Sequence, residues 1–237
     1  ASGTGDASGG GIRAQLLDND GTRLGPDFAV NNKSAGPQEQ SAVAALAASS
    51  THPAGGFVTV WLDRADANGA VFSNGAIRLA VFDADANRRP MSQLGGEVAE
   101  ILVASPAGQR VFAPAVAGLA DGGFVVVWQL VDPGSGLGTQ VRAQLFDAAG
   151  NARGAVITVG VPSSSEDQLG VDVAALASGG FVVAWNRADG DFNYNIDGQF
   201  FDSEGNALTG ADYLAPASYI SGGTVELVAL DGDRFAV

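Results

Sequence analysis

The chain has 237 residues, of which 26 are acidic and 12 basic, and its formal charge is −14. This charge repels phosphate backbones, so nucleic acid is excluded as an expected partner. The sequence contains no apolar run of about 18 residues, so no membrane-spanning helix is predicted. Because there is no cysteine and His52 is the single histidine, disulfides, Ser-His-Asp and Cys-His catalysis and histidine-ligated metal sites are excluded as well.

The predicted elements are short strands separated by turns rich in glycine, asparagine and aspartate. Two strands, 12–18 and 27–30, come first; three units of four strands follow, and a further pair ends the chain. The units cover 43–46, 57–61, 77–83 and 100–103; 116–119, 124–128, 141–147 and 155–159; and 173–176, 181–185, 196–202 and 212–214; the last pair covers 227–230 and 233–237.

A Gly-Gly-Phe phrase that ends in tryptophan marks the second strand of each unit. It begins at Gly55, Gly122 and Gly179, and a degraded copy begins at Asp233. The first two tryptophans are 67 residues apart and the next two 57, which places an insertion at about 91–110. Four-stranded units repeated at this spacing predict an all-β fold of antiparallel blades, the β-propeller.

The two ends of the chain complement each other, since each supplies the half of a blade that the other lacks. We therefore expect one domain, 1–237, in which the halves 1–30 and 224–237 share a blade and close a four-bladed ring. The complete blades are expected at about 41–103, 114–160 and 171–216. The alternative is a piece of a larger propeller, and in either case we expect the chain to come from a longer precursor.

Strand direction places the longest loops on one face of the predicted disc. Those between second and third strands are 1–11, 62–76, 129–140 and 186–195, and the loops between blades reach the same face. Because function concentrates in long loops, we expect the ligand there.

Several acidic residues of these loops are candidates for binding calcium. Asp189, Asp191 and Asn193 supply side-chain oxygens at alternate positions, the arrangement by which one hard cation collects ligands from a curved loop. Asp66 and Asp132 lie in equivalent loops. The Asp-x-x-Gly-Asn turns between third and fourth strands have a different explanation, because Asp and Asn cap hairpin turns by bonding their own backbone.

Polar residues before two of the inner strands are candidates for contact with a ligand. They are Gln38 and Glu39 before one strand and Glu166, Asp167 and Gln168 before another, and closure of the ring would bring their carboxylates together. Phe192 and Tyr194 occur in a single loop and are candidates for stacking on a ligand. The tryptophans recur in every unit, which favours a packing role.

Two stretches resemble a repeat of large secreted bacterial proteins, which often carry haemolysin-type, RTX-like calcium-binding segments or adhesin modules. They are 116–128 followed by 141–150, and 173–185 followed by 198–205. The resemblance implies secretion or a cell-surface location, and a place beside other domains in a larger protein. The glycine-rich nonapeptides of RTX proteins are absent, so their calcium roll is not implied.

The function that we expect is therefore an extracellular, non-catalytic binding or adhesion module with a glycan or protein ligand, and with calcium as its expected cation. One alternative is a carboxylate-based glycan hydrolase or lyase built on a propeller. Another is a structural spacer that binds nothing.

Overall fold

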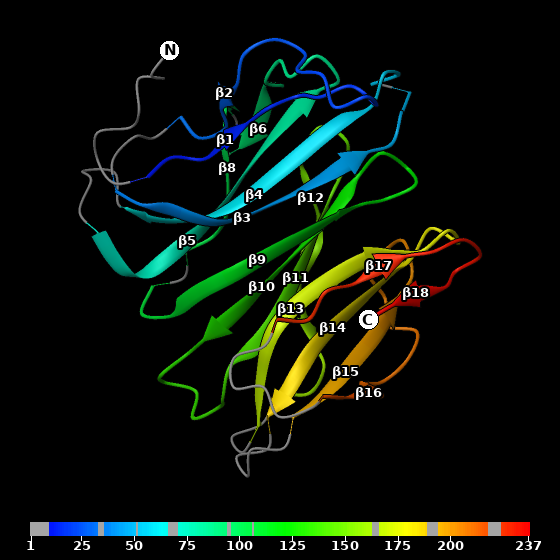
Figure 1. The fold of residues 1–237 in the computed structure, drawn as a ribbon. Coiled ribbons are helices and arrows are strands. Elements are labelled where there is room, and N and C mark those ends of the chain that lie inside the picture. The colour runs from blue at the N-terminus through cyan, green and yellow to red at the C-terminus, as the bar shows by residue number, and fades with distance from the viewer. Residues whose placement is uncertain are drawn as a thin grey trace.

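The computed structural model describes residues 10–32, 36–50, 52–65, 71–93, 96–105, 107–162, 166–188, 194–217 and 224–237. All regular structure in these residues is β (Figure 1). They contain no helix of the length and hydropathy that a membrane crossing would need.

Three four-stranded antiparallel sheets form the body of the chain, and in each the strands pair in chain order. The first contains β3 (Gln38–Leu46), β4 (Gly56–Ala65), β5 (Val71–Asp83) and β8 (Ile101–Ala104). The second contains β9 (Arg110–Gly118), β10 (Phe124–Val131), β11 (Gln140–Phe146) and β12 (Ala152–Val159). The third contains β13 (Asp167–Ala175), β14 (Phe181–Ala188), β15 (Tyr194–Phe201) and β16 (Asp212–Ala217). The predicted four-stranded units are confirmed.

The described residues also form three two-stranded sheets. At the two ends of the chain, β1 (Arg13–Ala14) pairs with β2 (Phe28–Ala29), and β17 (Val228–Ala229) pairs with β18 (Phe235–Ala236). The small hairpin of β6 (Met91–Gln93) and β7 (Gly96–Val98) lies between β5 and β8. It falls within the predicted insertion, whose place is thereby confirmed.

The two largest apolar clusters of the described residues lie on either side of the second sheet, and two smaller ones join the end hairpins to the first and third sheets. Val126 and Trp128 of β10 pack toward the first sheet, and Val125 and Val127 pack toward the third. Successive side chains of a strand point to opposite faces, so β10 must be apolar throughout to fill both layers. The tryptophans are buried, which confirms their packing role. Trp128 and Trp185 belong to these two layers and are 2% and 1% exposed, and Trp61, 0% exposed, belongs to the cluster between the first sheet and the first hairpin.

The second glycine of the Gly-Gly-Phe phrase is required for a steric reason. A Cβ on Gly56, Gly123 or Gly180 would lie 2.1, 2.5 or 2.3 Å from the carbonyl oxygen of the phenylalanine that ends the third strand of the same sheet. Only glycine permits this approach, which brings the two phenylalanines of each sheet into stacking contact. Their ring centroids are 4.9, 5.0 and 4.9 Å apart in the three sheets.

The Asp turns between third and fourth strands are capped by their own side chains, as predicted. In the second sheet, Oδ1 of Asp147 accepts hydrogen bonds from the amides of Ala149 and Asn151 at 2.9 and 2.8 Å. Asp18, Asp83 and Asp202 accept the same pair of bonds in their own turns. These carboxylate oxygens therefore stabilise the turns.

The shared blade expected from the two ends of the chain is not formed, and this prediction is corrected. Figure 1 shows β1–β2 beside the first sheet and β17–β18 beside the third, at opposite ends of the stack. Phe28 and Val30 pack on Trp61, whereas Leu227 and Phe235 pack on Leu176. Arg234 occupies in the last hairpin the place of the glycines that admit a third strand in the complete sheets, and we expect its side chain to obstruct one.

The predicted long loops are shorter than expected because the strands continue beyond the tryptophans. The expected loop 62–76 is strand up to Ala65 and again from Val71, and β14 continues to Ala188 before β15 starts at Tyr194. Charged residues in these extensions are typical of loops, which is why the sequence predicts loops there. The extensions place those charges on the sheets, beside the tryptophans.

Candidate functional site

One pair of positions recurs beside the tryptophan of every complete sheet. The first member lies two residues after the tryptophan on the second strand, and the other lies opposite the tryptophan on the third strand. Both point to the same face, because side chains two residues apart share a face and cross-strand neighbours do too. We call these positions the rim pair. Its members are Asp63 and Arg78, Leu130 and Arg142, and Arg187 and Asp197.

In the first sheet the rim pair is a closed ion pair. Nε of Arg78 donates to Oδ2 of Asp63 at 2.7 Å, and the Asp63 side chain is fully buried. Gln38 also approaches Asp63, with its amide nitrogen 3.5 Å from Oδ1. Both charges are therefore used in holding this end of the sheet.

In the third sheet the same pair, with its charges exchanged, lines a pocket of about 260 Å³. Nε of Arg187 donates to Oδ2 of Asp197 at 2.6 Å, and its Nη1 donates to Oε1 of Glu166 at 3.2 Å. The pocket also contains Gln168 and the buried Trp185, with Val161 and Ala211 at its sides. We call it the third-sheet pocket.

Asp197 is the residue of this pocket whose bonding is incomplete. It is 8% exposed, and its Oδ1 is buried and accepts no hydrogen bond from the described residues. A buried carboxylate oxygen without a donor is costly, so it favours a ligand that brings one. The Asp197 bond and the negative charges of Asp197 and Glu166 outweigh partial burial and raise the pKa of Arg187, so the guanidinium is fully charged.

Gln38 and Gln168, two of the predicted ligand residues, join parts of the fold. Oε1 of Gln168 accepts from the Val141 amide at 2.8 Å, and its Nε2 donates to the Val159 carbonyl at 3.2 Å, so it links the third sheet to the second. Oε1 of Gln38 accepts from the side chain of Asn31 at 2.9 Å. Both glutamines are buried.

The predicted carboxylates of the inner strands lie in separate sheets with separate partners. Glu39 pairs with Arg64 in the first sheet, whereas Glu166 pairs with Arg187 in the third. Oδ1 of Asp167 accepts from the Thr139 amide at 2.5 Å and so fixes the loop before β11. Within the described residues there is no group of three or more histidine, cysteine or acidic side chains that could hold a metal.

The candidates for cation binding lie mostly outside the described residues. Asp66, Asp189, Asp191 and Asn193 are in this category. Of the two residues predicted to stack on a ligand, Phe192 also lies outside the described residues, and of Tyr194 only the backbone is described, at the start of β15. Asp132 is described. Its Oδ1 accepts from the Gly134 amide at 2.9 Å and its Oδ2 from the side chain of Gln109 at 2.7 Å, an arrangement that shapes its loop.

Sequence reasoning missed the two residues that define the third-sheet pocket, Arg187 and Asp197. The repeat contained a usable signal, because both occupy positions fixed relative to a tryptophan. Aligning the units shows Asp63, Leu130 and Arg187 at one position and Arg78, Arg142 and Asp197 at the other. Opposite charges that exchange places between units indicate a contact.

Comparison with protein-family models gives no match for this chain. No curated protein matches it either.

Proposed function

We propose that this chain is a non-catalytic binding module of a secreted or cell-surface bacterial protein, and that it holds a glycan unit in the third-sheet pocket. The observation that carries the proposal is the buried Oδ1 of Asp197, which lacks a donor among the described residues in a pocket that also presents Glu166 and Arg187. Polar groups that converge in a small concave site are the usual sign of ligand binding.

The chemistry of the pocket favours a ligand rich in hydroxyl groups. A hydroxyl can donate to Asp197 or Glu166 and accept from the remaining N–H groups of Arg187. Binding pockets for drug-sized molecules measure about 300–1,000 Å³. The volume here, about 260 Å³, suits one small ring at the end or side of a longer chain.

The repeated sheets support the further proposal that they are blades of a β-propeller. Each has four antiparallel strands, and β10 is apolar on both faces because a sheet covers each side. Face-to-face packing of successive sheets is what a propeller requires. The resemblance to repeats of large RTX-like or adhesin proteins favours an extracellular place for such a unit.

Calcium is proposed for the segment that connects β14 to β15. Asp189, Asp191 and Asn193 have the spacing of a loop that wraps one cation. The segment follows Ala188, the last residue of β14, one position after Arg187. Because the segment follows Arg187 so closely in the sequence, the proposal includes calcium-dependent binding of the glycan.

The test is a glycan array probed with the intact chain, with calcium and with chelator, followed by calorimetry on any glycan retained. We expect Asp197→Asn to weaken binding at least tenfold, because one acceptor is replaced by a donor. Glu204→Gln makes the same change of charge in an exposed turn of this sheet and should leave binding unchanged. Asp191→Asn should remove the calcium dependence.

Two results would contradict the proposal. If Asp197→Asn retains full affinity for every glycan bound by the natural chain, the third-sheet pocket is not the site. If the chain releases products from the polysaccharides it binds, the module is an enzyme of the hydrolase or lyase class.

A further inference from the structure

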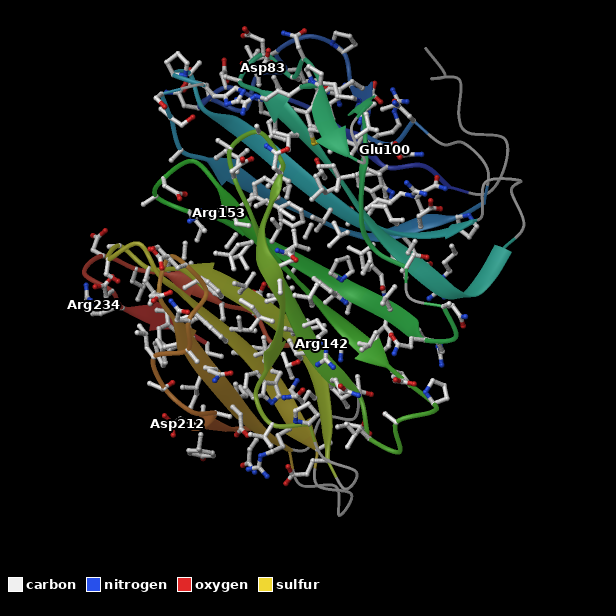
Figure 2. All side chains as sticks on the ribbon, turned by 180° about the vertical axis from the view of Figure 1, so that it is seen from behind. Asp83, Glu100, Arg142, Arg153, Asp212 and Arg234 are labelled. Carbon is white, nitrogen blue, oxygen red and sulfur yellow. The ribbon has the colours of Figure 1, made fainter. Side chains whose placement is uncertain are left out.

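The second sheet departs from the rim pair of its neighbours. Where the first sheet has Asp63, it has Leu130, and the arginine opposite the tryptophan is kept as Arg142. Figure 2 shows Arg142 on β11, in the middle of the stack. The Arg142 guanidinium forms no ion pair with any described residue. It donates to the Val141 carbonyl at 3.2 Å and to Oε1 of Gln140.

A hollow of about 340 Å³ lies at this guanidinium. Its lining is mainly apolar, and Gln109 and Ser105 are its other polar residues. We call it the second-sheet pocket, and its apolar members are Val103, Ala104, Trp128, Leu130 and Val156.

Arg142 is a cation in a partly apolar setting, without a counter-ion in the described part of the chain. Burial lowers the pKa of Arg142, and no carboxylate acts against this shift, in contrast to Arg187, whose pKa Asp197 raises. Three of the five guanidinium N–H groups have no acceptor among the residues that the structure describes. In each neighbouring sheet, the rim-pair arginine has a carboxylate within 2.7 Å.

We propose that the second-sheet pocket binds a small molecule that carries a carboxylate on an apolar body. The ligand carboxylate takes the role that Asp63 has in the first sheet. It enters from the pocket, since Leu130 fills the strand position itself, and accepts a forked pair of hydrogen bonds from Arg142. The apolar body packs on Val103 and Val156. Gln109, which also lines the pocket, donates to Oδ2 of Asp132, and the Gly134 amide donates to Oδ1 of the same carboxylate.

This site is separate from the third-sheet pocket, and the two proposals can fail independently. The third-sheet pocket presents two carboxylates beside Arg187 and takes a ligand whose hydroxyl groups both donate and accept. The second-sheet pocket presents a cation and takes an anion. A glycan without acidic groups would bind the first and leave the second empty.

The probes are 3-phenylpropionate and its neutral amide, titrated into the intact chain and followed by the Nε–H signal of Arg142 and the amide signals of β8, β10 and β11. We expect saturable shifts with the acid and at least tenfold weaker binding of the amide. The Arg142→Gln variant should bind the acid at least tenfold more weakly than the natural chain does. Arg153→Gln is the matched control, because Arg153 is on the same sheet and pairs with Asp121 at 2.7 Å.

Leu130→Asp is the decisive variant, since it keeps Arg142 and supplies the acid that the first sheet already has. An internal pair equivalent to Asp63 and Arg78 should reduce affinity for 3-phenylpropionate at least tenfold without loss of folding. The proposal is overturned if acid and amide bind alike, if the acid gives no saturable shift, or if folded Leu130→Asp binds the acid as the natural chain does.

Discussion

Asp63 of the first sheet and Arg187 of the third occupy the same position of the repeat and carry opposite charges. Each pairs with the residue opposite the tryptophan, Arg78 in one sheet and Asp197 in the other, with N–O distances of 2.7 and 2.6 Å. The same backbone therefore supports the ion pair in either orientation. The two sheets thus contain the same ion pair with its charges reversed.

The exchange predicts that the third-sheet pair can be reversed. Arg187→Asp alone places three carboxylates together and should destabilise the chain by about 2–3 kcal/mol, because the pair is largely buried. Adding Asp197→Arg recreates the arrangement of the first sheet and should restore most of that loss. Urea unfolding of the single and double variants measures both effects.

The control is the exposed pair of Arg153 and Asp121, for which reversal of one charge should cost at most about 1 kcal/mol. A double variant no more stable than Arg187→Asp alone would show that the two sheets do not support equivalent pairs.

The sequence predicts the sheets well because their signals are local. The Gly-Gly-Phe phrase and the Asp turn each act within one unit, the tryptophan recurs at a fixed position in each, and the structure confirms the role of all three. Strand length is harder to predict. Charged residues such as Asp63 and Arg78 predict a solvent-exposed loop as long as their contact with each other is not known. A charged side chain can be buried on a sheet at low cost only when an oppositely charged partner lies beside it.

The candidate site could be predicted only in part, for a related reason. Glu166 is recognisable from the sequence as a polar residue before a strand. Arg187 and Asp197 can be recognised as an ion pair only when their diagonal contact across two strands is known. That pairing depends on register, which single positions do not reveal. Convergence of Glu39 and Glu166 requires closure of the ring, a long-range event, and the structure places them in different sheets.

One Asp turn contains a residue that its backbone does not suit. Ala86 has a φ of 63°, whereas the equivalent turns have Gly21, Gly150 and Gly205 with φ of 80°, 82° and 86°. A left-handed residue with a Cβ costs roughly 1–2 kcal/mol, partly offset by the freedom that glycine has in the unfolded chain. We predict that Ala86→Gly raises the free energy of unfolding by about 1 kcal/mol.

Gly21→Ala is the matched reverse change, because a Cβ there meets nothing within 4 Å and only the backbone conformation is tested. It should lower stability by a similar amount, about 1 kcal/mol. Thermal unfolding of both variants beside the natural chain provides the measurement. Equal stability of all three would mean that the turns do not impose the left-handed conformation in solution.

Asp172 should make stability depend on pH. Burial raises its pKa above the ordinary value for an aspartate, and Glu226 adds to the rise, while the Leu227 amide donates to Oδ2 at 2.6 Å and opposes it. A raised pKa means that the folded chain binds the proton more tightly than the unfolded chain. The resulting stabilisation is complete below the unfolded pKa and is lost as the pH rises through the folded pKa.

The measurement compares the natural chain with Asp172→Asn, so that the contributions of all other titrating groups to the pH dependence of stability cancel. We expect the natural chain to lose stability relative to the variant over the pH range from the ordinary pKa of an aspartate up through the raised pKa of folded Asp172, with no further change above that range. Urea midpoints across this range give the difference. A difference that grows in the opposite direction would mean that the Leu227 hydrogen bond outweighs burial.

Arg234 should keep the two ends of the chain from joining. In the complete sheets the phenylalanines of the second and third strands lie directly opposite, as Phe124 does Phe146, and repeat alignment makes Phe235 and Leu17 the corresponding pair. Leu17 is 55% exposed, whereas the third-strand phenylalanines are buried. A Cβ at the Arg234 position would strike the carbonyl of the incoming strand, since one on Gly123 would lie 2.5 Å from that oxygen.

The test uses Leu17→Cys with Phe235→Cys in a chain that has no cysteine of its own. Directly opposed strand residues are within the Cα spacing of a disulfide, about 4.4–6.8 Å. We expect no intrachain disulfide under mild oxidation at low protein concentration. Arg110→Cys with Val131→Cys, a pair that faces across β9 and β10, should cross-link and serves as the positive control.

Replacing Asp233 and Arg234 by glycine restores the phrase of the complete sheets and removes the obstruction. The terminal cysteines should then cross-link to a measurable extent, because the last hairpin can admit β1 in the register of the other blades. Complete cross-linking while Arg234 is still present would show that the ends meet despite it, and the ring expected from the repeat would be the form in solution.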